Sequence, residues 1–282
     1  MNFLISGANG YLGSRLANAL EADGHRVIRI LRTPSPSVDG ISAEDIQKRK
    51  KISVPIDFVI HCATCYGRNG ESDAEIAQCN IMYALSILEY AALNRIPYFI
   101  NIGTSLPADI STYAFTKSQF VEWGKHYAQH HKINFIHLLL EHFYGPAENA
   151  EQKFIAMVIH NLLQNKNELR LTAGEQIRDF IHVADVINAI QTVIVHADEC
   201  HGFKMIPIGS GIGYRIKDVV SMIHHLTESR TELHFGALEY RQNELMYSCA
   251  DISILKKWGW TPEITLCDGL KQIIKEQKKC VF

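Results

Sequence analysis

The stretch Leu4–Leu20, LISGANGYLGSRLANAL, carries glycines at positions 7, 10 and 13, followed by apolar residues at helical spacing. Glycine weakens both strands and helix interiors, so three of them between an apolar strand and a helix need a specific reason. In a dinucleotide-binding β-α unit, the glycines allow a tight turn, a close approach of backbone to pyrophosphate, and close packing of helix on strand. The free N–H groups at the helix N-terminus then meet the phosphates. We predict that this loop binds a dinucleotide; a tight packing turn without a ligand is the alternative.

The N-terminal half of the chain alternates between strand and helix patterns. The strand patterns are almost continuously apolar, which is typical of parallel strands buried on both faces. Strands are expected at 3–7, 26–32, 55–63, 96–104 and 133–142, and helices at 12–23, 74–94 and 113–131. This order predicts an α/β fold with a doubly wound parallel sheet of the Rossmann type.

After Tyr144–Pro146 the rhythm of the sequence changes. A helix is expected near 152–165, strand-like sequence at 169–183, and further helices from Asp185 and from position 216. We therefore predict a Rossmann domain over 1–145 and a smaller mixed α/β substrate domain over 146–282, with a segment near 179–210 returning to the first domain.

Composition excludes several classes of protein. The net charge is −2, so no broad basic field indicates nucleic acid or an anionic membrane as partner. No apolar run is expected to reach the roughly 20 residues that span a bilayer, and the N-terminus shows no leader pattern. Seven cysteines without framework spacing indicate free thiols in a reducing cytoplasm. Cys62 and Cys65 form a C-x-x-C pair, for which we favour packing over a redox or metal role, and we expect no metal site.

The end of the second strand indicates which dinucleotide is bound. A carboxylate there would accept hydrogen bonds from the adenosine ribose and select NAD, whereas an arginine accommodates the 2′-phosphate of NADP. Here Leu31 stands where a carboxylate is expected, and Arg32 follows it. NADP is the predicted preference, and a solvated loop arginine is the alternative reading of Arg32.

Tyr113 and Lys117 are the candidate catalytic pair. Among the eleven tyrosines, only Tyr113 has a lysine four residues later, on the same face of an expected helix. We expect the nearby ammonium to lower the pKa of the phenol, which could then donate a proton to a carbonyl oxygen while hydride reaches its carbon. Thr104 and Ser105 follow a strand at its C-terminal end, where a hydroxyl could contact the same carbonyl. A surface Tyr–Lys pair is the alternative.

Together these residues resemble the extended short-chain dehydrogenase/reductase family, and specifically its nucleotide-sugar epimerases and dehydratases. The resemblance covers essentially the whole chain. It implies catalysis by Thr104, Tyr113 and Lys117, with Ser105 as the less favoured neighbour of Thr104. Further matches are HCATC, the helix asparagine, YGP, RDFIHVADV and the C-terminal GWTPEITLCDGL. The implied cofactor-binding residues are Gly7, Asn9, Gly10, Tyr11, Leu12, Gly13, Arg32, Cys62, Ala63, Thr64, Asn80, Tyr113 and Lys117.

Three departures narrow the resemblance. The sequence TSLP replaces the Asp-Glu pair of dehydratases after the threonine, the 105–112 loop is shorter than in epimerases, and His142 stands where many epimerases have asparagine. The pattern is most similar to CDP-abequose and CDP-paratose synthases, which are NADPH-dependent 4-ketoreductases of O-antigen sugar synthesis. A cofactor-retaining epimerase, or a non-catalytic dinucleotide-binding regulator on the same fold, are the alternatives.

The resemblance also implies a substrate site and an assembly. Arg178 and Arg241 match positions that hold the pyrophosphate of a sugar nucleotide, for which a planar guanidinium is suited. For Arg178 an ion pair with Asp179 or Asp185 is the alternative. His142 and Ser105 are expected to contact the sugar, and His61 is a weaker candidate for the same cleft. A homodimer in the cytoplasm, with a nucleotide diphosphate sugar as its ligand, completes the prediction.

Overall fold

The computed structural model describes residues 1–33, 38–148 and 153–281, and it divides the chain into two compact units. Unit 1 contains Met1–Leu139 and Gln191–Ile206, and unit 2 contains Leu140–Ile190 and Pro207–Phe282. The first long segment of unit 1 therefore ends at Leu139, six residues earlier than the boundary expected at 145. The returning segment is 191–206, which is shorter than the expected 179–210.

A seven-stranded sheet, in the order β10-β6-β5-β4-β1-β2-β3, forms the centre of unit 1. The neighbouring pairs from β3 through β6 are all parallel. This is the Rossmann-type doubly wound sheet that the alternating sequence predicts. The strands are β1 (Asn2–Ser6), β2 (Arg26–Leu31), β3 (Gly40–Ser42), β4 (Phe58–His61), β5 (Tyr98–Ile102), β6 (Asn134–Leu140) and β10 (Phe203–Ile208).

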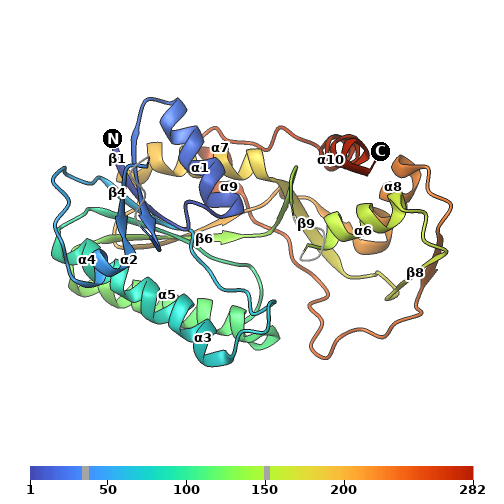
Figure 1. The fold of residues 1–282 in the computed structure, drawn as a ribbon, viewed down its shortest axis with the longest axis horizontal. Helices are drawn as coiled ribbons and strands as arrows, with labels where there is room; N and C mark the ends of the chain where they lie inside the picture. Colours follow the sequence, from blue (N-terminus) through green and yellow to red (C-terminus); the bar gives the residue numbers. More distant parts are fainter. Residues whose placement is uncertain (34–37, 149–152, 282) are drawn as a thin grey trace. The chain divides into compact units, whose positions relative to one another are not determined.

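Helices cover both faces of this sheet (Figure 1). In unit 1, α1 (Tyr11–Ala22) lies on one face, and α4 (Ala84–Leu93) and α5 (Thr112–His130) lie on the other. Apolar residues of β1, β4, α4 and α5 form one buried cluster, which includes Leu4, Val59, Leu88 and Phe120. The remaining helical segments of unit 1 are α2 (Ala43–Gln47), α3 (Asp73–Ala77), η1 (Gln78–Tyr83), η2 (Ala108–Ile110) and η3 (Ala197–Glu199), while α7 (Val183–Val195) belongs partly to each unit.

Asp73–Leu93 is one continuous helical segment made of α3, the π-helical η1 and α4. By length and composition it could cross a membrane, with a mean hydropathy of 1.3. The segment contains Asp73, Glu75 and Glu89, so it is not an uninterrupted apolar run of the kind that the sequence analysis expected to be absent. The packing of α4 explains its apolar composition, because Ala84, Ile87, Leu88 and Ala91 are fully buried in the cluster that includes the sheet.

Unit 2 is a smaller α/β body. A three-stranded sheet has the order β11-β9-β7, and a two-stranded parallel sheet pairs β12 with β8. Leu162, Val219 and Leu270 come from three different helices and are fully buried in one cluster. The elements are β7 (His142–Tyr144), α6 (Phe154–Leu163), β8 (Glu168–Leu171), β9 (Ile177–His182), β11 (Gly213–Arg215), α8 (Ile216–Thr227), β12 (Glu232–Phe235), α9 (Ser253–Lys257) and α10 (Leu266–Val281). A connection without helix or strand, 236–252, joins β12 to α9.

Candidate active site

The glycine loop of unit 1 lies between β1 and α1, as the sequence predicts. Gly7 has φ +69°, and a Cβ built on it would come within 2.5 Å of the Ala63 nitrogen. A Cβ on Gly13 would lie 2.2 Å from the carbonyl oxygen of Gly7, so both positions exclude any side chain. Gly10, the N-cap of α1, has no side chain to occupy the free N–H groups of the helix. The loop thus fits a dinucleotide pyrophosphate, with Asn9 and Gly10 exposed and Tyr11 and Leu12 opening the helix.

The end of β4 is held next to this loop by a buried asparagine. The Asn80 amide accepts a hydrogen bond from the Cys65 backbone N–H at 2.8 Å and donates one to the Cys65 carbonyl at 2.9 Å. The same amide donates to the Thr116 hydroxyl of α5 at 3.0 Å. Asn80 therefore connects η1, α5 and the loop after β4, which contains the half-buried Cys62, Ala63 and Thr64. This explains a polar side chain within an apolar helix.

Arg32 follows β2 directly and is exposed. Burial raises the pKa of Cys79 and of Tyr83, both in η1, and the positive charge of Arg32 opposes that rise. The charge of Arg32 therefore lies near η1. This position leaves the guanidinium available to a phosphate.

Thr104, Tyr113 and Lys117 come together in unit 1. The Thr104 hydroxyl accepts a hydrogen bond from the Leu106 N–H at 3.3 Å and is hydrogen-bonded to the phenol of Tyr113. Lys117 lies one turn further along α5 and is only 4% exposed. Thr104, Ser105 and Lys117 also line a cavity of about 240 Å³ whose other lining residues include Val121, His137 and Met205. A hydroxyl, a phenol and an ammonium group thus lie close to the C-terminal end of β5.

The expected effect of Lys117 on Tyr113 is wrong for this structure. Burial raises the pKa of Tyr113 instead of lowering it, and the hydrogen bond from Thr104 and the charge of Arg68 only partly oppose that rise. Sequence spacing correctly places Tyr113 and Lys117 on one helix, but it cannot report how deeply the phenol is buried. The phenol is consequently protonated at neutral pH, which is the form that donates a proton to a carbonyl oxygen.

Tyr66 packs against Tyr113, and Arg68 lies over the ring of Tyr66; the sequence analysis did not identify either residue. The rings of Tyr66 and Tyr113 lie 4.8 Å apart between centroids. The Arg68 guanidinium lies 5.2 Å from the centroid of the Tyr66 ring. Both residues belong to the loop after β4, only a few positions beyond the cofactor-binding motif. That proximity in the sequence is the single signal that could have drawn attention to them.

Lys117 is a buried cation. Burial lowers the pKa of its ammonium group to about 8, opposed weakly by Cys62 and Cys79. No hydrogen bond or ion pair of the ammonium falls within the part of the chain that the structure describes. A buried, unpaired charge costs stability, so its retention indicates a function that needs it.

His61 lies in the core of unit 1. It is 1% exposed, its Nδ1 lies 2.7 Å from the Ser6 hydroxyl, and its ring packs near Phe99 and Phe120. Cys62 and Cys65 are free thiols, and burial raises the pKa of Cys62 to about 12. A thiol with so high a pKa is a poor nucleophile and metal ligand.

In unit 2, Arg178 forms an ion pair that the sequence did not predict. Its Nη2 lies 2.6 Å from the Glu244 carboxylate, and its Nη1 donates to the Ile177 carbonyl at 2.8 Å. The expected alternative partners are wrong. Asp179 instead accepts from the backbone N–H groups of Ser210, Gly211 and Ala250. Asp185 accepts from those of Glu263 and Ile264.

His142 and Arg241, the other predicted substrate residues, also belong to unit 2. His142 is half-buried, with its Nδ1 3.6 Å from the Glu141 carboxylate, and Arg241 is exposed on the 236–252 connection. Glu141, another residue that the sequence analysis missed, is buried and accepts a hydrogen bond from the Ser248 hydroxyl at 2.7 Å. Its charge also acts on Arg178 and raises the pKa of the guanidinium against the effect of burial. Arg178 is therefore subject to the charge of two carboxylates.

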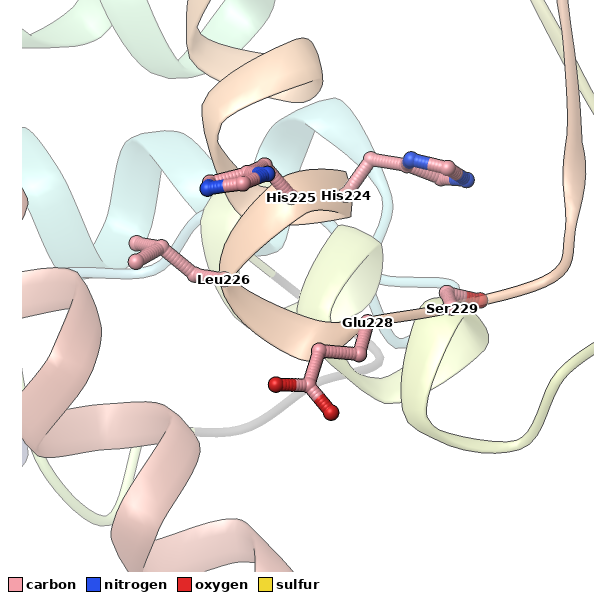
Figure 2. Close-up of a pocket in the computed structure, with 5 residues that line it drawn as sticks. All are labelled: His224, His225, Leu226, Glu228 and Ser229. Carbon is pink, nitrogen blue, oxygen red and sulfur yellow. The ribbon is translucent and has the colours of Figure 1, made fainter.

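A separate surface hollow of about 440 Å³ lies at the C-terminal end of α8 (Figure 2). It is lined by His224, His225, Leu226, Glu228 and Ser229 and contains none of the predicted site residues. His224 and His225 point in different directions, and His224 Nε2 lies 2.9 Å from the Thr231 carbonyl oxygen. Within 1–33, 38–148 and 153–281, no three histidine, cysteine or acidic side chains are grouped as metal ligands.

The fold, the glycine loop and the Thr-Tyr-Lys group define an NAD(P)-dependent enzyme of the oxidoreductase type. Residues 3–209 match the model of the NAD dependent epimerase/dehydratase family, and the chain belongs to that family. The chain is 32% identical to a CDP-abequose synthase of Salmonella typhimurium, over 96% of this chain and 97% of that protein. It is 24% identical to a putative UDP-glucose 4-epimerase of Methanocaldococcus jannaschii, over 98% of both chains.

Solved structures show the same fold. MoeE5 in complex with UDP-glucuronic acid and NAD superposes with a TM-score of 0.85 at 24% identity, over 99% of this chain and all of that one. The UDP-glucose 4-epimerase of Thermotoga maritima, with UDP-glucose, gives a TM-score of 0.84 at 22% identity over the whole of both chains. At this level of identity the likeness concerns the fold alone.

Proposed function

We propose that this enzyme reduces the 4-keto group of a nucleotide-linked deoxy sugar, with NADPH as hydride donor and a CDP-sugar as substrate. The observation that carries the proposal is the group formed by Thr104, Tyr113 and Lys117 in unit 1, together with the similarity to CDP-abequose synthases over nearly the full chain. The related epimerases act on nucleotide sugars too, which supports the coarser statement that the substrate is a nucleotide sugar.

Each side chain of the group has a role in this reaction. NADPH supplies the hydride when it is bound. The Thr104 hydroxyl orients the carbonyl oxygen, and the protonated Tyr113 donates a proton to it as negative charge develops. Lys117 holds a positive charge on the same helix face and binds the cofactor ribose. Gly7, Gly10 and Gly13 accept the cofactor pyrophosphate, while Arg32 pairs with the 2′-phosphate.

The cofactor preference rests on Arg32 and on Leu31, since no carboxylate stands at the end of β2. MoeE5 and the Thermus thermophilus UDP-glucose 4-epimerase are in complex with NAD, and the proposed choice of NADP rests on the end of β2 in this chain. The enzyme is further proposed to act in the cytoplasm as a homodimer in O-antigen sugar synthesis. The six cysteines that the structure describes are free thiols, as a reducing compartment favours.

The experiment is a panel of nucleotide-linked 4-keto sugars, with CDP, UDP, GDP and dTDP as carriers, incubated with NADPH or NADH. We expect oxidation of NADPH with the CDP-linked 4-keto-3,6-dideoxy sugar and much less with the other carriers. Interconversion of nucleotide hexoses without net oxidation of NADPH would instead show an epimerase. Tyr113→Phe is the control for non-enzymatic reduction.

A further inference from the structure

The Arg178–Glu244 ion pair occupies the place where a diphosphate is proposed to bind. The Arg178 side chain is 8% exposed and that of Glu244 is 21% exposed, so the pair is largely closed to solvent. A ligand phosphate cannot contact Arg178 fully while the Glu244 carboxylate remains on Nη2. The ion pair must therefore open before the guanidinium can offer Nη2, and its full charge, to a ligand anion.

The segment that carries Glu244 is suited to such an opening. The connection 236–252 has no helix or strand (Figure 1). It is attached on both sides of Glu244, because Leu238 donates to the Leu171 carbonyl, the Tyr240 hydroxyl accepts from the Glu175 N–H at 3.0 Å, and the Met246 carbonyl accepts from the Ile177 N–H. Between those attachments, Glu244 is anchored by its bond to Arg178 and by its own N–H, which donates to the Arg241 carbonyl at 3.1 Å.

The charges around Arg178 determine which anions can replace the Glu244 carboxylate. Arg178 interacts with two carboxylates, those of Glu244 and Glu141, and Glu141 is buried and fixed by Ser248. An incoming anion is repelled by both carboxylates until Glu244 leaves. Inorganic phosphate has a single phosphorus centre, so it replaces one carboxylate on Arg178 with one oxyanion group and gains little. A diphosphate has a second linked phosphate group, with further charge and acceptor oxygens for neighbouring donors, so it can outcompete one carboxylate.

We propose that Glu244 is a specificity-determining residue: it occupies Arg178 in the free enzyme, admits a nucleotide diphosphate in exchange, and excludes phosphate and other small anions. The inference rests on the proposed function, because it takes Arg178 as a residue of the diphosphate site. It goes further by assigning to Glu244 the selection between a diphosphate and a monophosphate.

The test uses the full-length enzyme with inorganic phosphate and inorganic diphosphate as probes, measured by calorimetry. In Glu244→Gln the amide keeps the shape of the side chain and loses its charge. We expect phosphate to bind about tenfold more tightly than in the wild type, with a smaller gain for diphosphate, so that the ratio of the two dissociation constants narrows. Glu239→Gln, an exposed glutamate of the same connection, removes the same charge and should leave the ratio unchanged.

A double-mutant cycle shows whether the effect passes through Arg178. In the Arg178→Ala background, Glu244→Gln should change neither affinity by more than about twofold. Unchanged or weaker phosphate binding in Glu244→Gln, or the same gain in Glu239→Gln, would overturn the proposal. The reduction assay is independent of this measurement. If Glu244→Gln changes the ratio of the two affinities but the wild type reduces no 4-keto sugar, the proposed reaction is refuted. If the wild type reduces the sugar but the ratio does not change in Glu244→Gln, the role of Glu244 is refuted.

Discussion

Thr104 and Tyr113 are hydrogen-bonded to each other through their side chains, although nine positions separate them in the chain. The bond is formed because the loop after β5 folds back over the N-terminal turn of α5, where the Ser111 hydroxyl caps the helix by accepting from the Ala114 N–H. The threonine and the tyrosine can therefore contact the same substrate oxygen. The short 105–112 loop, which the sequence analysis took as a departure from epimerases, connects Thr104 to the start of α5 and brings the two side chains together.

Removal of the phenolic hydroxyl should abolish proton donation without disturbing the fold. Tyr113→Phe is expected to lower kcat by roughly a hundredfold or more, the usual scale for the loss of a positioned acid. NADPH affinity should remain within about threefold, because the ring and its contact with Tyr66 are kept. Steady-state kinetics and calorimetry measure the two quantities. Turnover close to that of the wild type would remove Tyr113 from the mechanism.

The ring of Tyr66 is expected to position Tyr113. Tyr66→Leu removes the aromatic contact at 4.8 Å and should lower kcat by about threefold to tenfold. Tyr66→Phe keeps the ring and should restore most of the loss, which distinguishes ring packing from a role of the Tyr66 hydroxyl. If both variants lose activity equally, the hydroxyl of Tyr66 takes part and the packing interpretation is wrong.

Lys117 should be required for turnover but should lower the free energy of unfolding. Its pKa of about 8 lies below the ordinary lysine value of 10.5, so between these values the folded state binds fewer protons than the unfolded state. The free energy of unfolding therefore rises with pH across that window, and below pH 8 the buried charge is destabilising. Lys117→Met should raise the stability of the cofactor-free protein at pH 7 by about 1 to 3 kcal/mol while it abolishes turnover.

The pH dependence provides the control for this prediction. The excess free energy of unfolding of Lys117→Met over the wild type should shrink as the pH rises from 8. It should be almost lost near pH 10.5, where the lysine of the folded wild type is neutral. Urea unfolding of both proteins at several pH values measures the difference, and other titrating groups cancel in the comparison. A variant that is less stable than the wild type at pH 7 would contradict the assignment of Lys117 as a destabilising buried cation.

The sequence predicts those parts of the site that depend on local spacing. Gly7, Gly10 and Gly13 lie where β1 becomes α1, and Tyr113 and Lys117 share a helix, because these relationships are set within a few residues. The environment of the phenol could not be predicted in this way. Burial raises the pKa of Tyr113, and burial depends on elements remote from it in the chain.

Contacts between residues far apart in the chain could not be predicted from the sequence either. Glu244 lies 66 positions after Arg178, and the sequence offered the adjacent Asp179 and nearby Asp185 as partners instead. Those two carboxylates bind backbone N–H groups and so are already satisfied. Glu141 and Ser248 are 107 positions apart, and no periodicity connects them. Contacts of this kind follow from the path of the 236–252 connection, which has no secondary-structure pattern to read.

Arg32 should decide the preference between the two dinucleotides. The wild type is expected to bind NADPH more tightly than NADH by roughly tenfold to a hundredfold, which corresponds to about 1 to 3 kcal/mol for a charge-assisted contact. Arg32→Ala should remove most of that difference by weakening NADPH and leaving NADH nearly unchanged. Arg26→Ala, which removes another exposed arginine paired with Asp39, is the matched control. Equal affinities in the wild type would refute the role of Arg32.

Arg178 and Arg241 should differ in what their loss does to the protein. Arg178 is buried and paired, whereas Arg241 is exposed. Arg178→Ala leaves Glu244 and Glu141 without their cation, so it should lower both stability and the affinity for CDP, the latter by about 2 to 4 kcal/mol. Arg241→Ala should weaken CDP binding by about 1 to 2 kcal/mol and leave the melting temperature unchanged, because its side chain has water around it in the free protein.

Lysine replacements separate charge from geometry at the same two positions. Arg178→Lys should recover only part of the CDP affinity, since an ammonium group cannot bind a phosphate and the Ile177 carbonyl with one planar fork. Arg241→Lys should recover most of it, because an exposed site contributes mainly charge. NADPH binding, measured in the same calorimetry series, should be unaffected by all four variants. A parallel loss of NADPH affinity, or equal CDP binding in the wild type and both alanine variants, would show that these arginines do not form the diphosphate site.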